Sequence, residues 1–289
     1  MRTFSVKHMS LSKSRSNKLK KVITYSLLML LCAFSLFPIL WILFSSFKAT
    51  SEIYSIPPRW LPSKFTLEHY FRVIANPVMR RSFLNSFIIS SVTTFIAVFF
   101  SILSSYAFSR FRFHMRIPLY YFILTTRMLP LSILIVPLYI LFVKLDLINK
   151  FLGIIIVYTA LSLPLGVWLF RGFFTTIPIE IEEAAMIDGC SRLQALLKVD
   201  LPLLGPAIGA VSMYVFLFCW NHFMIATLLA TAPEIRPIAV ALKFYKDENY
   251  VDWGALLAAS IIMTIVPVIV FVSLQKYFSK GMTEGAVIE

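Results

Sequence analysis

The residue types that usually carry catalysis are present in this chain of 289 residues, but they lie in no catalytic pattern. No glycine is followed by lysine, so the phosphate-binding loop GxxxxGK(S/T) is absent, and GxSxG and HExxH are absent as well. The four histidines are scattered and the three cysteines form no CxxC pair: His8, His69, His114, His222, Cys32, Cys190 and Cys219. The sequence therefore predicts that the chain is not an enzyme, binds no metal and holds no ATP itself.

In one segment, the spacing of the residues predicts a short helix–turn–helix and not a catalytic site. Residues 180–186 are rich in helix formers, and Asp188-Gly189 is typical of a turn because glycine accepts positive φ. Ser191 can cap a second short helix that runs to Asp200, and Leu201-Pro202 should end that helix. We therefore expect a helix–turn–helix in which neither helix is long enough to span a membrane.

The composition places this segment in a polytopic membrane protein. Hydrophobic residues make up 59% of the chain and charged residues only 14%, whereas a soluble domain has about 25% charged residues. Aromatic residues make up 15%, which excludes disorder. The net charge of +13 lies between apolar runs, so it indicates membrane topology and no nucleic-acid partner.

Six apolar segments are long enough to cross the hydrocarbon core, which takes about 20 residues. None of them contains Asp or Glu, and the first is too long for the apolar part of a signal peptide. The sequence thus predicts an all-α protein with six transmembrane helices, at residues 22–47, 83–109, 117–143, 152–170, 205–230 and 254–275.

The orientation follows from the basic tail 1–21, which has seven Lys and Arg residues and no acid. By the positive-inside rule this tail is cytoplasmic, and six spans return the C-terminal tail to the same side of the cell (inner or plasma) membrane. The loop 231–253 then faces outward and is either a solvated connector or a docking surface. The expected parts are the tail 1–21, the first transmembrane helix 22–47, an extracytoplasmic loop 48–82, a five-helix core 83–275 with a cytoplasmic loop 171–204, and a cytoplasmic tail 276–289.

The helix–turn–helix segment resembles the EAA signature of permeases of binding-protein-dependent ABC importers. That signature reads Glu-Ala-Ala, three residues, Gly, nine residues, Ile, one residue and Leu-Pro. This chain has Glu183-Ala184-Ala185, Gly189, Val199 in place of Ile, and Leu201-Pro202. Other stretches are similar to the carbohydrate branch, in particular the second, six-helix permease of maltose-type importers: Asn85-Ser86, 107–113, Trp220-Asn221 and 275–287.

The resemblance implies a type-1 ABC importer permease fold and a set of partners. These are a homologous second permease, two cytoplasmic ATPase subunits that bind ATP-Mg, an extracytoplasmic solute-binding protein, a sugar or oligosaccharide, and membrane lipid. It also implies a surface that couples to the ATPase, formed by Glu183, Ala184, Ala185, Asp188, Gly189, Leu201 and Pro202.

Three residues inside the predicted spans are candidates for the translocation path: Arg127, Trp220 and Asn221. Arg127 has no acid within the spans to pair with, so it should face water, backbone carbonyls or another subunit. Asn221 should make an interhelical hydrogen bond, typically ~0.6 kcal/mol, or face the sugar beside Trp220. Structural and path roles are both open for these residues.

Two other functions are possible on this sequence. An ABC permease could carry a non-sugar solute such as glycerol phosphate. An ion-coupled secondary transporter is disfavoured, because such proteins place ionisable groups near the bilayer midplane and the predicted spans hold no carboxylate.

Overall fold

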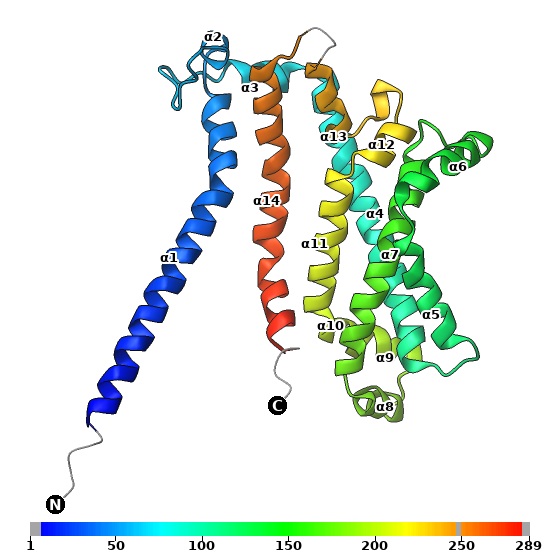
Figure 1. The fold of residues 1–289 in the computed structure, drawn as a ribbon. Coiled ribbons are helices and arrows are strands. Elements are labelled where there is room, and N and C mark those ends of the chain that lie inside the picture. Colours follow the sequence, from blue (N-terminus) through cyan, green and yellow to red (C-terminus); the bar gives the residue numbers. More distant parts are fainter. Residues whose placement is uncertain (1–6, 247–249, 285–289) are drawn as a thin grey trace, which may run out of the picture. The chain divides into compact units, whose positions relative to one another are not determined.

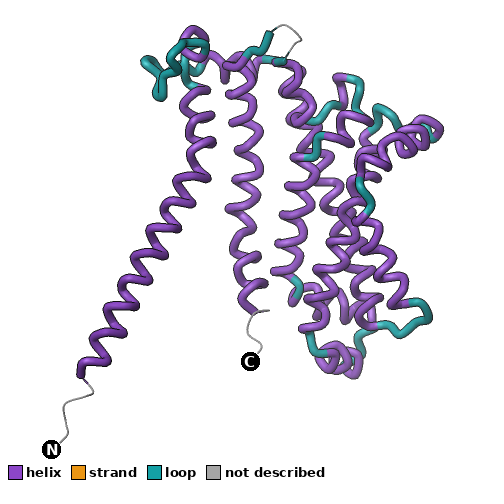
Figure 2. Tube along the Cα trace, viewed as in Figure 1, coloured by secondary structure: helices purple, strands orange, loops and turns teal. Residues whose placement is uncertain are grey.

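The computed structural model describes residues 7–246 and 250–284, and the regular elements in these ranges are all helices (Figure 2). Lys246 and Val251 form an isolated antiparallel bridge. Parts of both predicted tails, residues 1–6 and 285–289, lie outside the described residues. The prediction of an all-α chain is confirmed for the described part.

Four of the described helices are long and apolar enough to cross a membrane. Each contains one of the predicted spans, at 22–47, 83–109, 152–170 or 254–275, apart from Phe47 at the end of the first. They are α1 (Lys7–Ser46, apolar over Lys20–Ser46), α4 (Pro77–Arg110), α7 (Phe151–Thr176) and α14 (Trp253–Glu284, apolar over Trp253–Gln275).

The predicted span 117–143 is broken in the middle. It consists of α5 (Arg116–Thr125) with the 3-10 turn η1 (Thr126–Met128), and of α6 (Leu131–Lys144), which meet at a bend of 97°. Pro130 lies at the break. Proline disfavours helical backbone at the residue before it and has no N–H to donate, which favours a break here. It does not force one, since Pro137 and Pro164 lie inside α6 and α7.

The predicted span 205–230 is also divided. α11 (Gly205–Asn221) ends at Asn221, and α12 (Met224–Leu229) begins after two residues without helical structure. A bend of 77° separates α11 from the helical segment before it. By length and composition, the described chain thus has four spans, or six if each bent pair counts as one span.

The chain forms two compact units: residues 1–70 with 252–261, and residues 71–251 with 262–289. In the first, α2 (Thr50–Ile53) and the start of α3 (Glu68–Ala75) belong to a folded loop after α1. Lys48 Nζ donates to the carbonyl of Arg59 at 2.6 Å, and a ring nitrogen of His69 lies 3.0 Å from the carbonyl oxygen of Lys48. The loop is therefore fixed to itself by buried polar groups.

The second unit has its core where α4, α7 and α11 pack together (Figure 1). One face of α4 is buried and carries small residues every three or four positions: Ser82, Ser86, Ser90, Thr93, Ala97, Ser101 and Ser105. Small residues let helix backbones approach closely. At Gly166 of α7 the approach is so close that a Cβ atom would lie 2.2 Å from Ser101 Oγ.

Candidate functional site

The segment after α7 has the helix–turn–helix form that the sequence predicts. α8 (Ile179–Ile187) ends at a turn in which Gly189 has a φ of +91°. The N–H of Cys190 donates to the carbonyl of Ala185, and that of Gly189 to the carbonyl of Met186, the two bonds of a Schellman turn. A side chain at position 189 would strain this backbone, so glycine is needed there.

The second helix starts as predicted but does not end at Leu201-Pro202. The Ser191 side chain and Gln194 form a capping box at the start of α9 (Arg192–Ala195). The helix continues as a π-helical segment, η2 (Leu196–Asp200), in which the N–H of Leu201 bonds to the carbonyl of Leu196. Pro202 then lies in the first turn of α10 (Leu201–Leu203), where a missing N–H is tolerated.

The predicted coupling residues lie together in this segment, at one end of the second unit (Figure 1). Glu183, Ala184, Asp188, Gly189 and Pro202 are exposed, and Ala185 and Leu201 are half-buried. Several large apolar side chains of the same segment are exposed as well: Ile179, Ile181, Ile187, Leu193, Leu197 and Leu203. A surface of this kind is typical of a contact with a protein or a membrane.

Sequence analysis missed the buried acid of this segment, Glu182. Its side chain is only 3% exposed, and its Oε2 lies 2.8 Å from Nε of Arg110, which is 8% exposed. The Tyr106 hydroxyl donates to Oε1 of the same carboxylate. Arg110 is the last residue of α4 and also donates from Nη2 to the carbonyl of Ile177 at 3.1 Å.

A second buried acid, Asp200, lies at the end of η2. Neither of its carboxylate oxygens has a hydrogen-bond partner among the described residues. Burial raises the pKa of Asp200 to about 6; the charge of Glu182 acts in the same direction, and that of Arg110 opposes it. The carboxyl group is therefore protonated more readily than an exposed aspartate.

The three path candidates lie in different surroundings. Arg127 is exposed, and its guanidinium donates to the Tyr214 hydroxyl and lies 5.6 Å from the centre of that ring. Its partner is thus a tyrosine of the same chain, which the sequence analysis did not consider. Asn221 donates to the carbonyl of Leu217 at 3.0 Å, within its own helix, and makes no interhelical bond among the described residues.

Trp220 is fully buried and does not form an aromatic platform beside Asn221. Its Nε1 donates to the carbonyl of Met263 at 3.1 Å, and its ring meets Phe83 edge-on at 5.4 Å. The aromatic side chains on the less buried face of α11 are Tyr214 and Phe218, which stack with ring centres 6.3 Å apart. Spacing alone does not single them out, because the buried Phe216 and Trp220 on the opposite face are also four residues apart and stacked.

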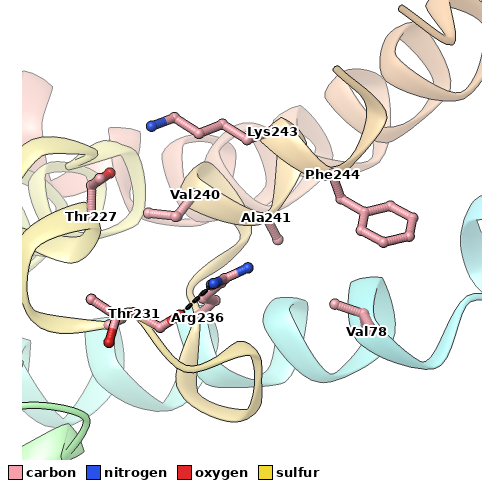
Figure 3. A pocket seen from close by; sticks show the side chains of 9 residues that line it. Val78, Thr227, Thr231, Arg236, Val240, Ala241, Lys243 and Phe244 are labelled. Carbon is pink, nitrogen blue, oxygen red and sulfur yellow. Dashed lines mark hydrogen bonds between the residues drawn. The ribbon is translucent and has the colours of Figure 1, made fainter. Parts of the chain in front are cut away.

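The other end of α4 carries a cavity of about 340 Å³ (Figure 3). It lies among the first turn of α4, α12, α13 (Ile238–Ala241) and η4 (Leu242–Tyr245), next to the turn η3 (Pro233–Ile235). The lining residues include two cations and no acid: Val78, Thr227, Ala230, Thr231, Arg236, Val240, Ala241, Lys243 and Phe244.

The segment that forms one wall of this cavity is fixed to α4 by two polar residues. Asn85 Nδ2 donates to the carbonyls of Glu234 and Arg236, at 2.9 and 3.1 Å, and Ser86 Oγ accepts from the N–H of Ile238 at 2.7 Å. The Arg236 guanidinium in turn donates from Nε to the carbonyl of Thr231 at 3.1 Å. The backbone of this wall and the Arg236 guanidinium are therefore already held in place without a bound ligand.

Comparison with known proteins identifies the family. The profile of the family described as "Binding-protein-dependent transport system inner membrane component" matches residues 97–284, which is more than half of the chain. The chain belongs to this family. It is thus a multi-pass membrane protein and the permease component of a binding-protein-dependent transport system.

Similar permeases cover nearly the whole chain. The trehalose/maltose transport system permease protein MalG of Thermococcus litoralis is 34% identical over 275 residues, which are 94% of this chain and 98% of that protein. The sulfoquinovosyl glycerol transport system permease protein SmoH of Agrobacterium fabrum is 34% identical over 251 residues, 86% of this chain and 88% of SmoH.

A solved structure has the same fold as this permease. It is the crystal structure of a bacterial ABC transporter involved in the import of the acidic polysaccharide alginate. The TM-score is 0.80 at 25% identity, and the match covers 91% of this chain and 98% of that chain. The predicted type-1 ABC importer permease fold is confirmed.

The buried carboxyl group of Asp200 predicts a pH-dependent stability of the permease. Its pKa is raised above the ordinary 3.8 in the folded chain, so its contribution to stability is lost as the pH rises from about 4 to about 6. We expect the thermal midpoint of Asp200→Asn, relative to the wild type, to rise over this interval and to stay constant above it. Thermal unfolding of the purified permease in detergent measures this. The exposed Asp188→Asn is the control, and a pH-independent difference for Asp200→Asn would contradict the assignment.

Proposed function

We propose that this permease is a subunit of an ATP-driven importer for a sugar or oligosaccharide and forms half of its translocation path. The observation that carries the proposal is the similarity over nearly the full chain to permeases whose names specify trehalose/maltose and sulfoquinovosyl glycerol transport. A diacetylchitobiose uptake permease of Streptomyces coelicolor is also 30% identical over 251 residues. A non-sugar solute is the alternative within the same mechanism.

The permease works with partners that supply what this chain lacks. A homologous second permease completes the path, two cytoplasmic ATPase subunits bind and hydrolyse ATP-Mg, and a solute-binding protein delivers the solute. The chain itself carries out no bond chemistry, in keeping with the absence of a phosphate-binding loop from its sequence. The exposed apolar side chains of the segment from α8 to α10, together with Glu183, support contact of this segment with an ATPase subunit.

The orientation of the permease in the membrane follows from the proposed contact between the α8–α10 segment and the ATPase. α4 has 34 residues, which makes it about 50 Å long at 1.5 Å per residue. Its last residue, Arg110, meets α8, whereas Val78 in its first turn lines the cavity. If α8 meets the ATPase, the cavity faces the extracytoplasmic side, where the binding protein docks. With six spans, four before α8 and two after it, both chain termini are then cytoplasmic.

The cavity supports docking of an acidic side chain of the binding protein. Arg236 and Lys243 are its two cations, and no acid lines it. Asn85 and Ser86 hold the wall that carries Arg236, so little ordering is needed when a partner binds. Opposite charges across an interface chiefly raise the association rate and select the partner.

The less buried face of α11 supports a role in the path. Polar side chains within a span face a bundle interior or water, since lipid does not solvate them. On this face Tyr214 and Phe218 are half-buried and stack, Asn221 at the helix end is exposed, and the exposed Arg127 of η1 contacts Tyr214. Such a face offers rings for stacking on a sugar and donors for its hydroxyl groups, and Trp220 supports it from the core.

Reconstitution tests the function directly. In proteoliposomes that contain this permease, the second permease, the ATPase and the binding protein, we expect solute uptake that requires ATP. The permease alone should give no uptake under a proton or sodium gradient, because its sequence has no ATP site and the spans predicted from it hold no carboxylate. Gradient-driven uptake by the isolated permease would refute the proposal.

The same vesicles test the docking cavity. Arg236→Glu together with Lys243→Glu should reduce the stimulation of ATP hydrolysis by the binding protein and leave the basal rate unchanged. Lys150→Glu is the control, because Lys150 is exposed and pairs locally with Asp146. Equal stimulation of the double variant and the wild type would remove the cavity from the docking surface.

Charge reversal on α8 tests the contact with the ATPase. Glu183→Lys should abolish uptake and co-purification of the ATPase, whereas Glu180→Lys on the same helix, also exposed and outside the signature, should retain both. The measurements are uptake and the amount of ATPase that co-purifies with a tagged permease. Full activity of the Glu183→Lys variant would show that this residue is not part of the contact.

A further inference from the structure

We infer that the buried ion pair between Arg110 and Glu182 transmits the movement of α8 to α4, so that both residues are positioning residues for transport. The inference rests on the proposed function, because it assumes that α8 meets the ATPase. It concerns a different residue from the signature acid, since Glu183 is exposed and Glu182 is buried.

The pair joins three helices at one point. Arg110 ends α4 and pairs with Glu182 of α8 at 2.8 Å, and it also donates to the carbonyl of Ile177, the residue that follows α7. Tyr106 lies one turn before Arg110 on α4 and donates to the same carboxylate. Residues four apart share a helix face, so Tyr106 and Arg110 of α4 both contact the Glu182 carboxylate.

Aromatic packing restricts the movement of these side chains. The Arg110 guanidinium lies 5.9 Å from the ring centre of Phe174, a fully buried residue of α7, and the Tyr106 ring lies 5.8 Å from the same centre. Glu182 therefore meets α4 through a packed and nearly dry contact. An ion pair in such a buried place is screened by salt much less than one on an exposed surface.

The side chains are needed because the backbone of α8 packs mainly elsewhere. Its main backbone neighbours are α9 and η2, which belong to the same segment. Within the described chain, the segment also contacts the end of α4 through Arg192 of α9, whose guanidinium lies 4.9 Å from the ring centre of Phe111, the residue after α4. On α8 itself, Glu182 is held directly by two side chains of α4, so loss of this contact should weaken the transmission of a movement from α8 to α4.

A structural role alone is the competing explanation, and a hydrophobic replacement separates the two. Removing one partner leaves an unpaired buried charge and destabilises the fold, but replacing both partners with apolar side chains of similar volume is often neutral or stabilising. Arg110→Met with Glu182→Met should therefore assemble with its partners. It keeps the burial and loses the directional bonds to Tyr106 and Ile177.

The test is the amount of solute imported per ATP hydrolysed by the full complex in proteoliposomes. We expect Glu182→Gln and the double Met variant to hydrolyse ATP when the binding protein is present, but with this ratio lowered on the order of tenfold, a size common for coupling between sites. Glu180→Gln, an exposed neighbour on α8, is the control and should keep the wild-type ratio.

The outcomes are distinct for the inference and for the proposed function. A wild-type ratio in either assembled variant, Glu182→Gln or the double Met variant, would overturn the inference. If Glu182→Gln does not assemble, the double Met variant decides. A wild-type complex without ATP-dependent uptake would instead refute the proposed function, before any variant is compared.

Discussion

The ion pair between Arg110 and Glu182 ties the segment after α7 to the end of α4. A charge in a low-dielectric interior needs a partner, and these two side chains have few alternatives, since they are 8% and 3% exposed. The pair brings residues far apart in the sequence to one point and leaves the next acid, Glu183, exposed. The exposed surface of α8, which we propose contacts an ATPase subunit, is thus supported from the inside by a buried ion pair.

α4 connects the exposed surface of α8 to the rest of the permease. Its last turn carries Arg110, and its first half carries Asn85 and Ser86, which hold the wall of the cationic cavity. Between them, a face of small residues lets α7 approach closely, as Gly166 shows. A closely packed helix of this kind resists bending, so a displacement at one end reaches the other.

The preferences of residues for helix caps and turns predicted those parts of the site that depend only on residues close together in the sequence. Gly189 has positive φ because the end of α8 requires it, and Ser191 caps α9 through its own side chain. The apolar runs of α1, α4, α7 and α14 also predicted these spans, since composition over about 20 residues decides whether a helix can cross a membrane.

Long-range contacts could not be predicted in this way. Spacing does not tell whether Glu180, Glu182 or Glu183 turns inward, because the answer depends on Arg110 and Tyr106, at the end of a different helix. The partner of Arg127 is likewise 87 positions further along the chain.

The same holds for the side chains of the fifth predicted span. Whether Trp220 faces a solute or the core depends on Met263 and Phe83, which lie on two other helices. Asn221, by contrast, finds its acceptor one turn back in its own helix.

Transmission through the ion pair requires that α8 and α4 move as one body, and the distance between them can be measured. Glu180 on α8 and Phe100 on α4 are exposed, and Glu180 lies outside the proposed ATPase contact, so both positions can carry spin labels as cysteines in a variant without the native Cys32, Cys190 and Cys219. Pulsed electron paramagnetic resonance on the full complex would give the distance between the labels without nucleotide and with trapped ATP. We expect one narrow distance distribution that is the same in both states; a shift or a second distance with ATP would show that α8 and α4 move independently.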